Sequence, residues 1–119
     1  IMLLNAVNSG RLTLEHVVRL VAETPARLYR LWPKKGNLQP GGDADLVLID
    51  MDRKHVLTNK TVLSKAGWTP YDGLNVRGRS LATYVRGNLV ARDGKVMAGP
   101  GTGQYLSGPG AQNASHAST

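Results

Sequence analysis

Apolar residues near the start of the chain recur every three or four positions, a spacing typical of one face of a helix. The stretch 3–8 predicts the end of a helix, and Gly10 can adopt the left-handed conformation that closes helices. Thr13 predicts the N-cap of a second helix, with the acidic Glu15 favourably placed in its first turn. The face of this helix that we expect to be buried consists of Leu14, Val17, Val18 and Val21.

Thr24-Pro25 predicts that a new helix starts, because threonine caps helices and proline fits their first turn. This short helix carries Ala26, Leu28, Tyr29 and Leu31. Two short consecutive helices cannot cover each other's apolar stripes and a sheet as well. We therefore expect both stripes to pack against further structure.

From Trp32 to Asp45 the chain is rich in Pro, Lys, Gly and Asp, and helical periodicity stops. Apolar runs typical of strands follow, and they predict a small antiparallel β unit. The expected division is helices in 1–35, the β unit in 36–97 and an extended or disordered tail in 98–119. The predicted strands are 46–49, 55–57, 73–77, 81–86 and 89–91, separated by a turn at 50–52, by Arg77-Gly78 and by Arg86-Gly87-Asn88, with a hairpin at Asp93-Gly94.

The chain has 119 residues, 41% of them apolar, which suits one small globular unit. A complete (β/α)₈ barrel needs roughly 250 residues and cannot be present. The absence of cysteine excludes thiol chemistry and fits a reducing, cytoplasmic compartment, and no apolar run is long enough to span a membrane. The first residue is not Met, so a processed or partial product is expected.

The net charge is +7, from 15 basic and 8 acidic residues, which raises the question of nucleic-acid binding. The basic residues are spread along the chain up to residue 97 and form no block or tail. Neither an aromatic stacking platform nor a zinc-finger spacing accompanies them. This distribution argues against a nucleic-acid partner.

Three histidines, His16, His55 and His116, fall on a predicted helix, a predicted strand and the tail. None has the spacing of metal ligands, so no metal site is assigned. Asp43 and Asp45 share one face of an extended segment and could form a carboxylate dyad. Aspartates at a glycine-rich strand entry more often cap a turn, and that interpretation is favoured here.

The glycine-rich stretch 99–103 superficially resembles a phosphate-binding loop. It lacks the lysine that follows in such loops and a strand-to-helix context, which favours a flexible loop. Motifs that activate a serine are also missing from the sequence. Residue types and spacings alone therefore assign no catalytic, cofactor-binding or metal-ligating residue.

The order of several short motifs resembles the C-terminal portion of the cyclic amidohydrolases, which include dihydroorotase, dihydropyrimidinase or hydantoinase, and allantoinase. The likeness covers residues 3–106. Ser64-Lys65 and Thr69-Pro70-Tyr71 are more similar to dihydroorotase or allantoinase, and Gly101-x-Gly103-x-Tyr105 is more similar to hydantoinase, so the member stays open. The matching motifs, in chain order, are Leu4 to Thr13, Thr24 to Leu28, Lys35-Gly36, Gly41 to Leu48, Ser64-Lys65, Thr69 to Gly73, Val85-Arg86-Gly87 and Gly99 to Leu106.

The resemblance implies an α/β architecture in which the last helices of a (β/α)₈ amidohydrolase barrel are followed by part of an antiparallel β-sandwich. It also implies a hydrolase that cleaves cyclic amide C–N bonds, with one or two zinc ions that activate water. The family's ligands are an H-x-H motif, a carboxylated lysine, two further histidines and an aspartate, and all precede the family's equivalent of Ile1. No ligand or catalytic residue can therefore be assigned in this sequence.

The resemblance further implies that the helices up to Leu31 close the barrel, that Gly41 to Asp45 lead into the sandwich, and that Thr69 to Gly73 position a loop. The chain alone is then expected to be inactive, and its expected partner is the N-terminal remainder of the same enzyme. The complete enzyme is expected to be a homo-oligomer that acts on a small cyclic amide. The substrate expected first is dihydroorotate. The alternatives are a non-catalytic structural or oligomerisation module of the same fold and, from the charge, a nucleic-acid binder.

Overall fold

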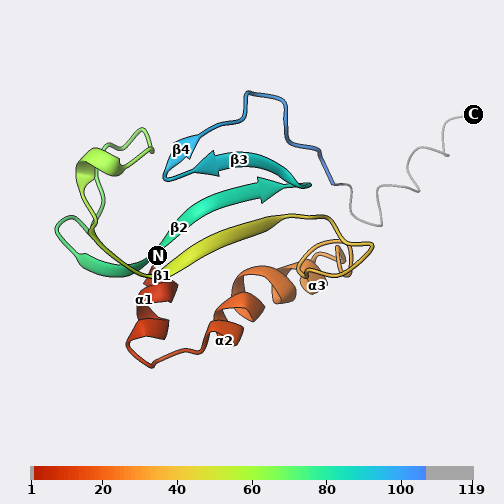
Figure 1. The fold of residues 1–119 in the computed structure, drawn as a ribbon, viewed down its shortest axis with the longest axis horizontal. Helices are drawn as coiled ribbons and strands as arrows, with labels where there is room; N and C mark the ends of the chain where they lie inside the picture. Colours follow the sequence, from red (N-terminus) through yellow and green to blue (C-terminus); the bar gives the residue numbers. More distant parts are fainter. Residues whose placement is uncertain (1, 107–119) are drawn as a thin grey trace, which may run out of the picture.

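The computed structural model describes residues 2–106, which form a curved antiparallel sheet bordered on one side by helices (Figure 1). The strands follow one another in space as they do in sequence, in the order β1-β2-β3-β4. The helical elements are α1 (Met2–Asn8), α2 (Leu14–Val18), a π-helical segment η1 (Arg19–Glu23), α3 (Thr24–Leu28) and a 3₁₀ turn η2 (Asn59–Thr61); the strands are β1 (Leu46–Val56), β2 (Asn75–Val85), β3 (Asn88–Arg92) and β4 (Lys95–Val96).

The sequence correctly predicts how the first two helices end and begin. Gly10 follows α1 with φ of 73°. Thr13 has extended backbone, and its side-chain Oγ1 accepts a hydrogen bond from the backbone N–H of His16 at 3.2 Å. These signals are local, so the sequence alone is enough to find them.

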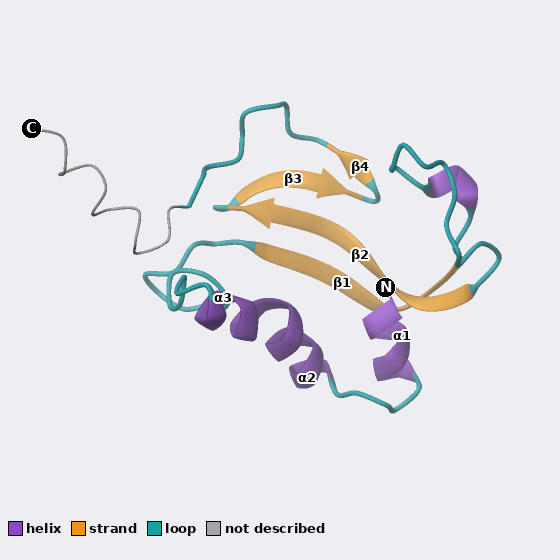
Figure 2. Cartoon of the chain, turned by 180° about the vertical axis from the view of Figure 1, so that it is seen from behind, coloured by secondary structure: helices purple, strands orange, loops and turns teal. Residues whose placement is uncertain are grey.

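The helix predicted at Thr24 is present as α3, with Pro25 in its first turn. It does not start anew, however, because α2, η1 and α3 form one continuous rod (Figure 2). Thr24 has helical backbone angles and caps nothing, and its N–H donates to the carbonyl of Arg19, five residues back. Pro25 has no N–H to donate, so the helix passes this position with a widened turn instead of ending.

The sheet contains fewer and longer strands than the apolar runs predict. The turn expected at 50–52 is a bulge within β1, where the Asp50 carboxylate accepts hydrogen bonds from the backbone N–H groups of Asp52 and Arg53. The break expected at Gly78 lies inside β2, with φ of 105°. The Asp93-Gly94 hairpin is confirmed, and it joins β3 to β4.

Gly78 is buried beneath α1, and this contact explains the glycine better than a turn does. A Cβ built at this position would lie 3.0 Å from the Cβ of Leu4. Asn8 Nδ2, one turn further along α1, donates to the carbonyl of Arg77 at 2.8 Å. The helix α1 therefore packs closely against the sheet at Gly78, because this strand residue has no side chain.

The described residues bury little apolar surface. The helices α2 and α3 contact mainly the segment η1 between them rather than the sheet. The loop after α3 folds back at Gly36, which approaches Ala22 and Ala26. Between residues 2 and 106, no helix is long and apolar enough to cross a membrane. The buried apolar residues are Leu4, Val17, Ala26, Val76 and Ala82.

Residues 97–106 follow β4 without helix or strand. Arg86 Nη2 donates to the carbonyl of Thr102 at 2.6 Å, which ties this stretch to the turn between β2 and β3. The remainder of the predicted tail, 107–119, lies outside the described residues.

Candidate functional site

Three charged residues, Lys35, Asp43 and Asp45, connect the loop after the helices to the start of the sheet, and we call this cluster the charged joint. Lys35 Nζ lies 2.7 Å from Asp43 Oδ2 and also pairs with Asp45. The other carboxylate oxygen of Asp45 accepts the backbone N–H of Arg86 at 2.8 Å, in the turn between β2 and β3. The two aspartates considered as a dyad thus converge on a lysine, and Asp45 caps a turn distant in sequence instead of its own.

The joint shifts the pKa values of its members in the directions expected of ion pairs. Partial burial acts to lower the pKa of Lys35, but its hydrogen bonds to Asp43 and Asp45 outweigh burial and raise it above its ordinary value. Partial burial likewise acts to raise the pKa of Asp45, while Lys35 and the Arg86 backbone bring it below its ordinary value. Both groups are held in their charged forms, which suits a structural role rather than proton transfer.

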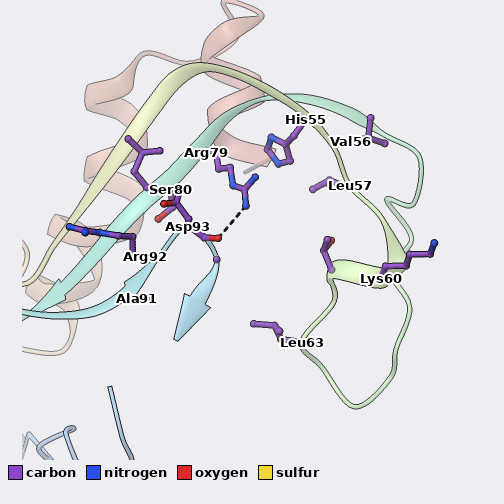
Figure 3. Close-up of a pocket in the computed structure, with 13 residues that line it drawn as sticks. His55, Val56, Leu57, Lys60, Leu63, Arg79, Ser80, Ala91, Arg92 and Asp93 are labelled. Atoms are coloured by element: carbon purple, nitrogen blue, oxygen red, sulfur yellow. Dashed lines mark hydrogen bonds between the residues drawn. The ribbon is translucent and has the colours of Figure 1, made fainter. Parts of the chain in front are cut away.

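A hollow of about 510 Å³ lies between the loop that follows β1 and the turn between β3 and β4 (Figure 3). The side chains of Leu57 and Leu63 point into it from the loop. Lys60 and Arg92 point away from it, and Arg79 donates a 3.4 Å hydrogen bond to the carbonyl of Asp93. Because these basic groups do not point toward a common position, the hollow lacks the geometry of an anion-binding site.

The histidines do not come together in the structure. His16 is exposed on α2, while His55 lies on β1 with a buried Nδ1 that has no protein hydrogen-bond partner. Residues 2–106 contain no cluster of three or more His, Asp or Glu side chains that could hold a metal ion, and His116 lies outside them. The described residues therefore do not fit the zinc that the family resemblance implies.

Uncovered apolar surface is the most prominent feature of this part of the chain. Only Val17 of the helical face predicted to be buried is in fact buried, and Val18 and Val21 are 51% and 58% exposed. On the sheet, Val47 and Leu48 are 49% and 50% exposed. The prediction is wrong because nothing in residues 2–106 covers the stripe, although its apolar pattern is present. Contiguous exposed apolar side chains are typical of surfaces that bind other polypeptide.

Residues 7–91 match the model of a protein family described as the amidohydrolase family. An L-hydantoinase of Paenarthrobacter aurescens is 42% identical over 105 residues, which cover 88% of this chain and 23% of that protein. A dihydroorotase of Pyrococcus abyssi is 39% identical over 99 residues, which cover 83% of this chain and 24% of that protein. The chain thus spans about a quarter of the length of these relatives.

Solved structures agree with the sequence relatives. The L-hydantoinase (dihydropyrimidinase) of Arthrobacter aurescens superposes with a TM-score of 0.78 at 41% identity, over 82% of this chain and 22% of that one. A D-hydantoinase structure superposes with a TM-score of 0.79 at 31% identity. The chain belongs to the amidohydrolase family, and relatives named hydantoinase, dihydropyrimidinase and dihydroorotase are similar to it over most of its length.

Proposed function

We propose that this chain is the closing segment of a metal-dependent cyclic amidohydrolase. It supplies the last helices of the barrel and part of the β-sandwich, while polypeptide outside this chain supplies the zinc ligands and the catalytic groups. The zinc held there would supply the activation of water that hydrolysis of a cyclic amide requires. The residues of this chain contribute to activity by stabilising the fold around that site.

The uncovered apolar surface is the observation that carries this proposal. A soluble domain of this length normally buries about two-thirds of the surface of its unfolded chain. In residues 2–106, most of the apolar face of the helical rod and the apolar residues Val47, Leu48 and Ile49 of β1 are exposed, and the L-hydantoinase relative is about four times as long as this chain. A larger polypeptide with complementary apolar surfaces accounts for both facts.

The substrate proposed for the complete enzyme is a small cyclic amide or imide, with dihydroorotate first and hydantoin and allantoin as alternatives. A dihydroorotase at 39% identity and a hydantoinase at 42% both support the class. Because the two sequence identities are similar, they favour neither dihydroorotate nor a hydantoin as the substrate. Offering these three substrates, in that order, to the complete polypeptide that carries this sequence tests the choice.

A chimera tests the role of the chain. In it, the full 119-residue chain replaces the matching quarter of the Paenarthrobacter aurescens L-hydantoinase. We expect a soluble enzyme that hydrolyses a substituted hydantoin, because the transferred surfaces derive from one family. The untouched L-hydantoinase is the positive control, and the 119-residue chain alone, expected to be inactive, is the negative one. A folded chimera without hydrolytic activity contradicts the proposed role.

A further inference from the structure

Two aspartates of the chain are followed directly by glycine, in Asp72-Gly73 and Asp93-Gly94. An aspartate in this position can react with its own backbone, because glycine has no Cβ to keep its nitrogen away from the aspartate side chain. Both dipeptides lie in exposed turns. The structure holds the two turns differently, and this difference determines which aspartate can react.

At Asp72-Gly73, both groups that would react are engaged in hydrogen bonds. The carboxylate oxygen Oδ1 of Asp72 accepts the backbone N–H of Asn59 at 2.7 Å. The Gly73 N–H donates to the carbonyl of Leu57 at 2.8 Å. Both hydrogen bonds have to break before the Gly73 nitrogen can approach the side chain, and each one adds to the free energy of doing so.

At Asp93-Gly94, the same two groups are held weakly. Within residues 2–106, the Gly94 N–H donates to no acceptor. The Asp93 carboxylate pairs with Arg53 at 3.3 Å, and both side chains are exposed, so the pair contributes little. Arg79 Nη2 donates to the Asp93 carbonyl oxygen at 3.4 Å (Figure 3). Positive charge at that oxygen favours loss of the Gly94 amide proton, because the oxygen shares the resulting negative charge.

The turn at Asp93 can also open locally. It joins β3 to β4, which has only two residues, and short strands at the end of a sheet open at a lower free energy than inner strands. Asp93 has φ of 49°, a conformation that side-chain-bearing residues adopt at some cost. Rotation of Asp93 out of this conformation therefore relieves strain while it brings the side chain to the Gly94 nitrogen.

We propose that Asp93 is a site of spontaneous isoaspartate formation in the folded protein and that Asp72 is protected. The Gly94 nitrogen bonds to the carboxyl carbon Cγ of Asp93, and the carboxyl hydroxyl leaves with the amide proton as water. Water then opens the resulting five-membered succinimide ring at one of its two C–N bonds. Cleavage at the Asp93 main-chain carbonyl leaves the chain running through Cγ as isoaspartate, whereas cleavage at Cγ restores aspartate.

The modification lengthens the backbone between β3 and β4 by one carbon and leaves the mass unchanged. A two-residue turn aligns Arg92 with Lys95 in the unmodified hairpin. The longer connection no longer fits this register, so β4 is expected to lose its pairing with β3. The inference concerns this turn alone and does not depend on the proposed function.

Digestion with endoproteinase Asp-N tests the proposal, because this protease cuts before aspartate and not before isoaspartate. The complete polypeptide that carries this sequence, or the chimera if that polypeptide does not fold, is incubated for several weeks below its melting transition. The fraction of chains left uncut at positions 72 and 93 is then followed with time. We expect isoaspartate to accumulate at Asp93 at least about tenfold faster than at Asp72, since two hydrogen bonds hold the Asp72 site.

The same protein in denaturant is the matched control. Both dipeptides are Asp-Gly, so the two positions should react at similar rates once the turns are lost. Equal rates in the folded protein would overturn the inference. A folded protein that forms no isoaspartate at Asp93, although it does so in denaturant, would also overturn it. Methylation by an isoaspartate-specific carboxyl methyltransferase confirms the identity of the uncut product.

Discussion

At the scale of single residues, Gly78 lies beneath Leu4 of α1, where there is little room for a side chain. Gly78→Ala places a Cβ 3.0 Å from that of Leu4 and puts alanine at φ of 105°. Backbone strain and overpacking each cost about 1–3 kcal/mol, so we expect the apparent melting temperature of the chimera to fall by several degrees. Gly99→Ala is the matched control, since a Cβ there meets nothing within 4 Å. Equal melting temperatures for the two variants would contradict the packing described.

The Asp45 carboxylate is expected to hold the turn between β2 and β3. In the chimera, Asp45→Ala removes the acceptor of the Arg86 N–H. A charge-assisted hydrogen bond of about 1.5 kcal/mol corresponds to roughly tenfold faster exchange of that amide. Asp43→Ala, which loses only a contact to Lys35, should leave the Arg86 amide unchanged. Similar acceleration in both variants would show that the turn depends on the ion pair as a whole.

The hydrogen bond from the Arg86 backbone N–H to Asp45 should weaken at acidic pH. The pKa of Asp45 lies below its ordinary value of 3.8, so its contribution is complete above pH about 4 and is lost as the pH falls through the lowered value. We expect protection of the Arg86 amide to fall below pH 4, measured against the neighbouring Gly87 amide. Gly87 donates to the Ala44 carbonyl, which does not titrate, so it corrects for general loosening. A constant ratio down to pH 3 would contradict the assignment.

At the scale of elements, the exposed stripe on the rod formed by α2, η1 and α3 should be covered in the complete protein. Val21→Asp in the chimera then buries a charge, and we expect a loss of at least about 2 kcal/mol, seen as a lower apparent melting temperature. Arg19→Asp, an exposed position on the same rod, is the control and should change stability by less than about 0.5 kcal/mol. Equal effects would mean that the stripe stays exposed.

The sequence predicts those features of the elements that depend on neighbouring residues. Thr13, Gly10 and Asp93-Gly94 act within one turn, and each is found where expected. From the sequence alone Gly78 predicts a break, because Leu4, the residue that requires a glycine there, lies far away in sequence. The sequence likewise does not identify the role of Lys35, since its carboxylate partners lie 8 and 10 positions further along a glycine-rich loop.

At the scale of the whole molecule, the apolar pattern predicts burial but not what provides the covering. Val18 and Val21 have the spacing of a packed face and are nevertheless exposed in residues 2–106. The same pattern together with the motif order predicts a larger parent enzyme of the amidohydrolase family, and residues 7–91 match that family's model. No sequence signal locates catalytic groups here, because the proposed function places them in other polypeptide.

This chain is proposed to need the rest of an amidohydrolase to form a stable core, and thermal unfolding of the isolated chain is the sharpest test of that need. Circular dichroism during thermal unfolding, combined with sedimentation equilibrium, reports cooperativity and mass together. We predict either self-association or a broad, non-cooperative transition, since few apolar residues are buried. A sharp, reversible transition of a monomer, unchanged over a wide range of protein concentration, would contradict the account.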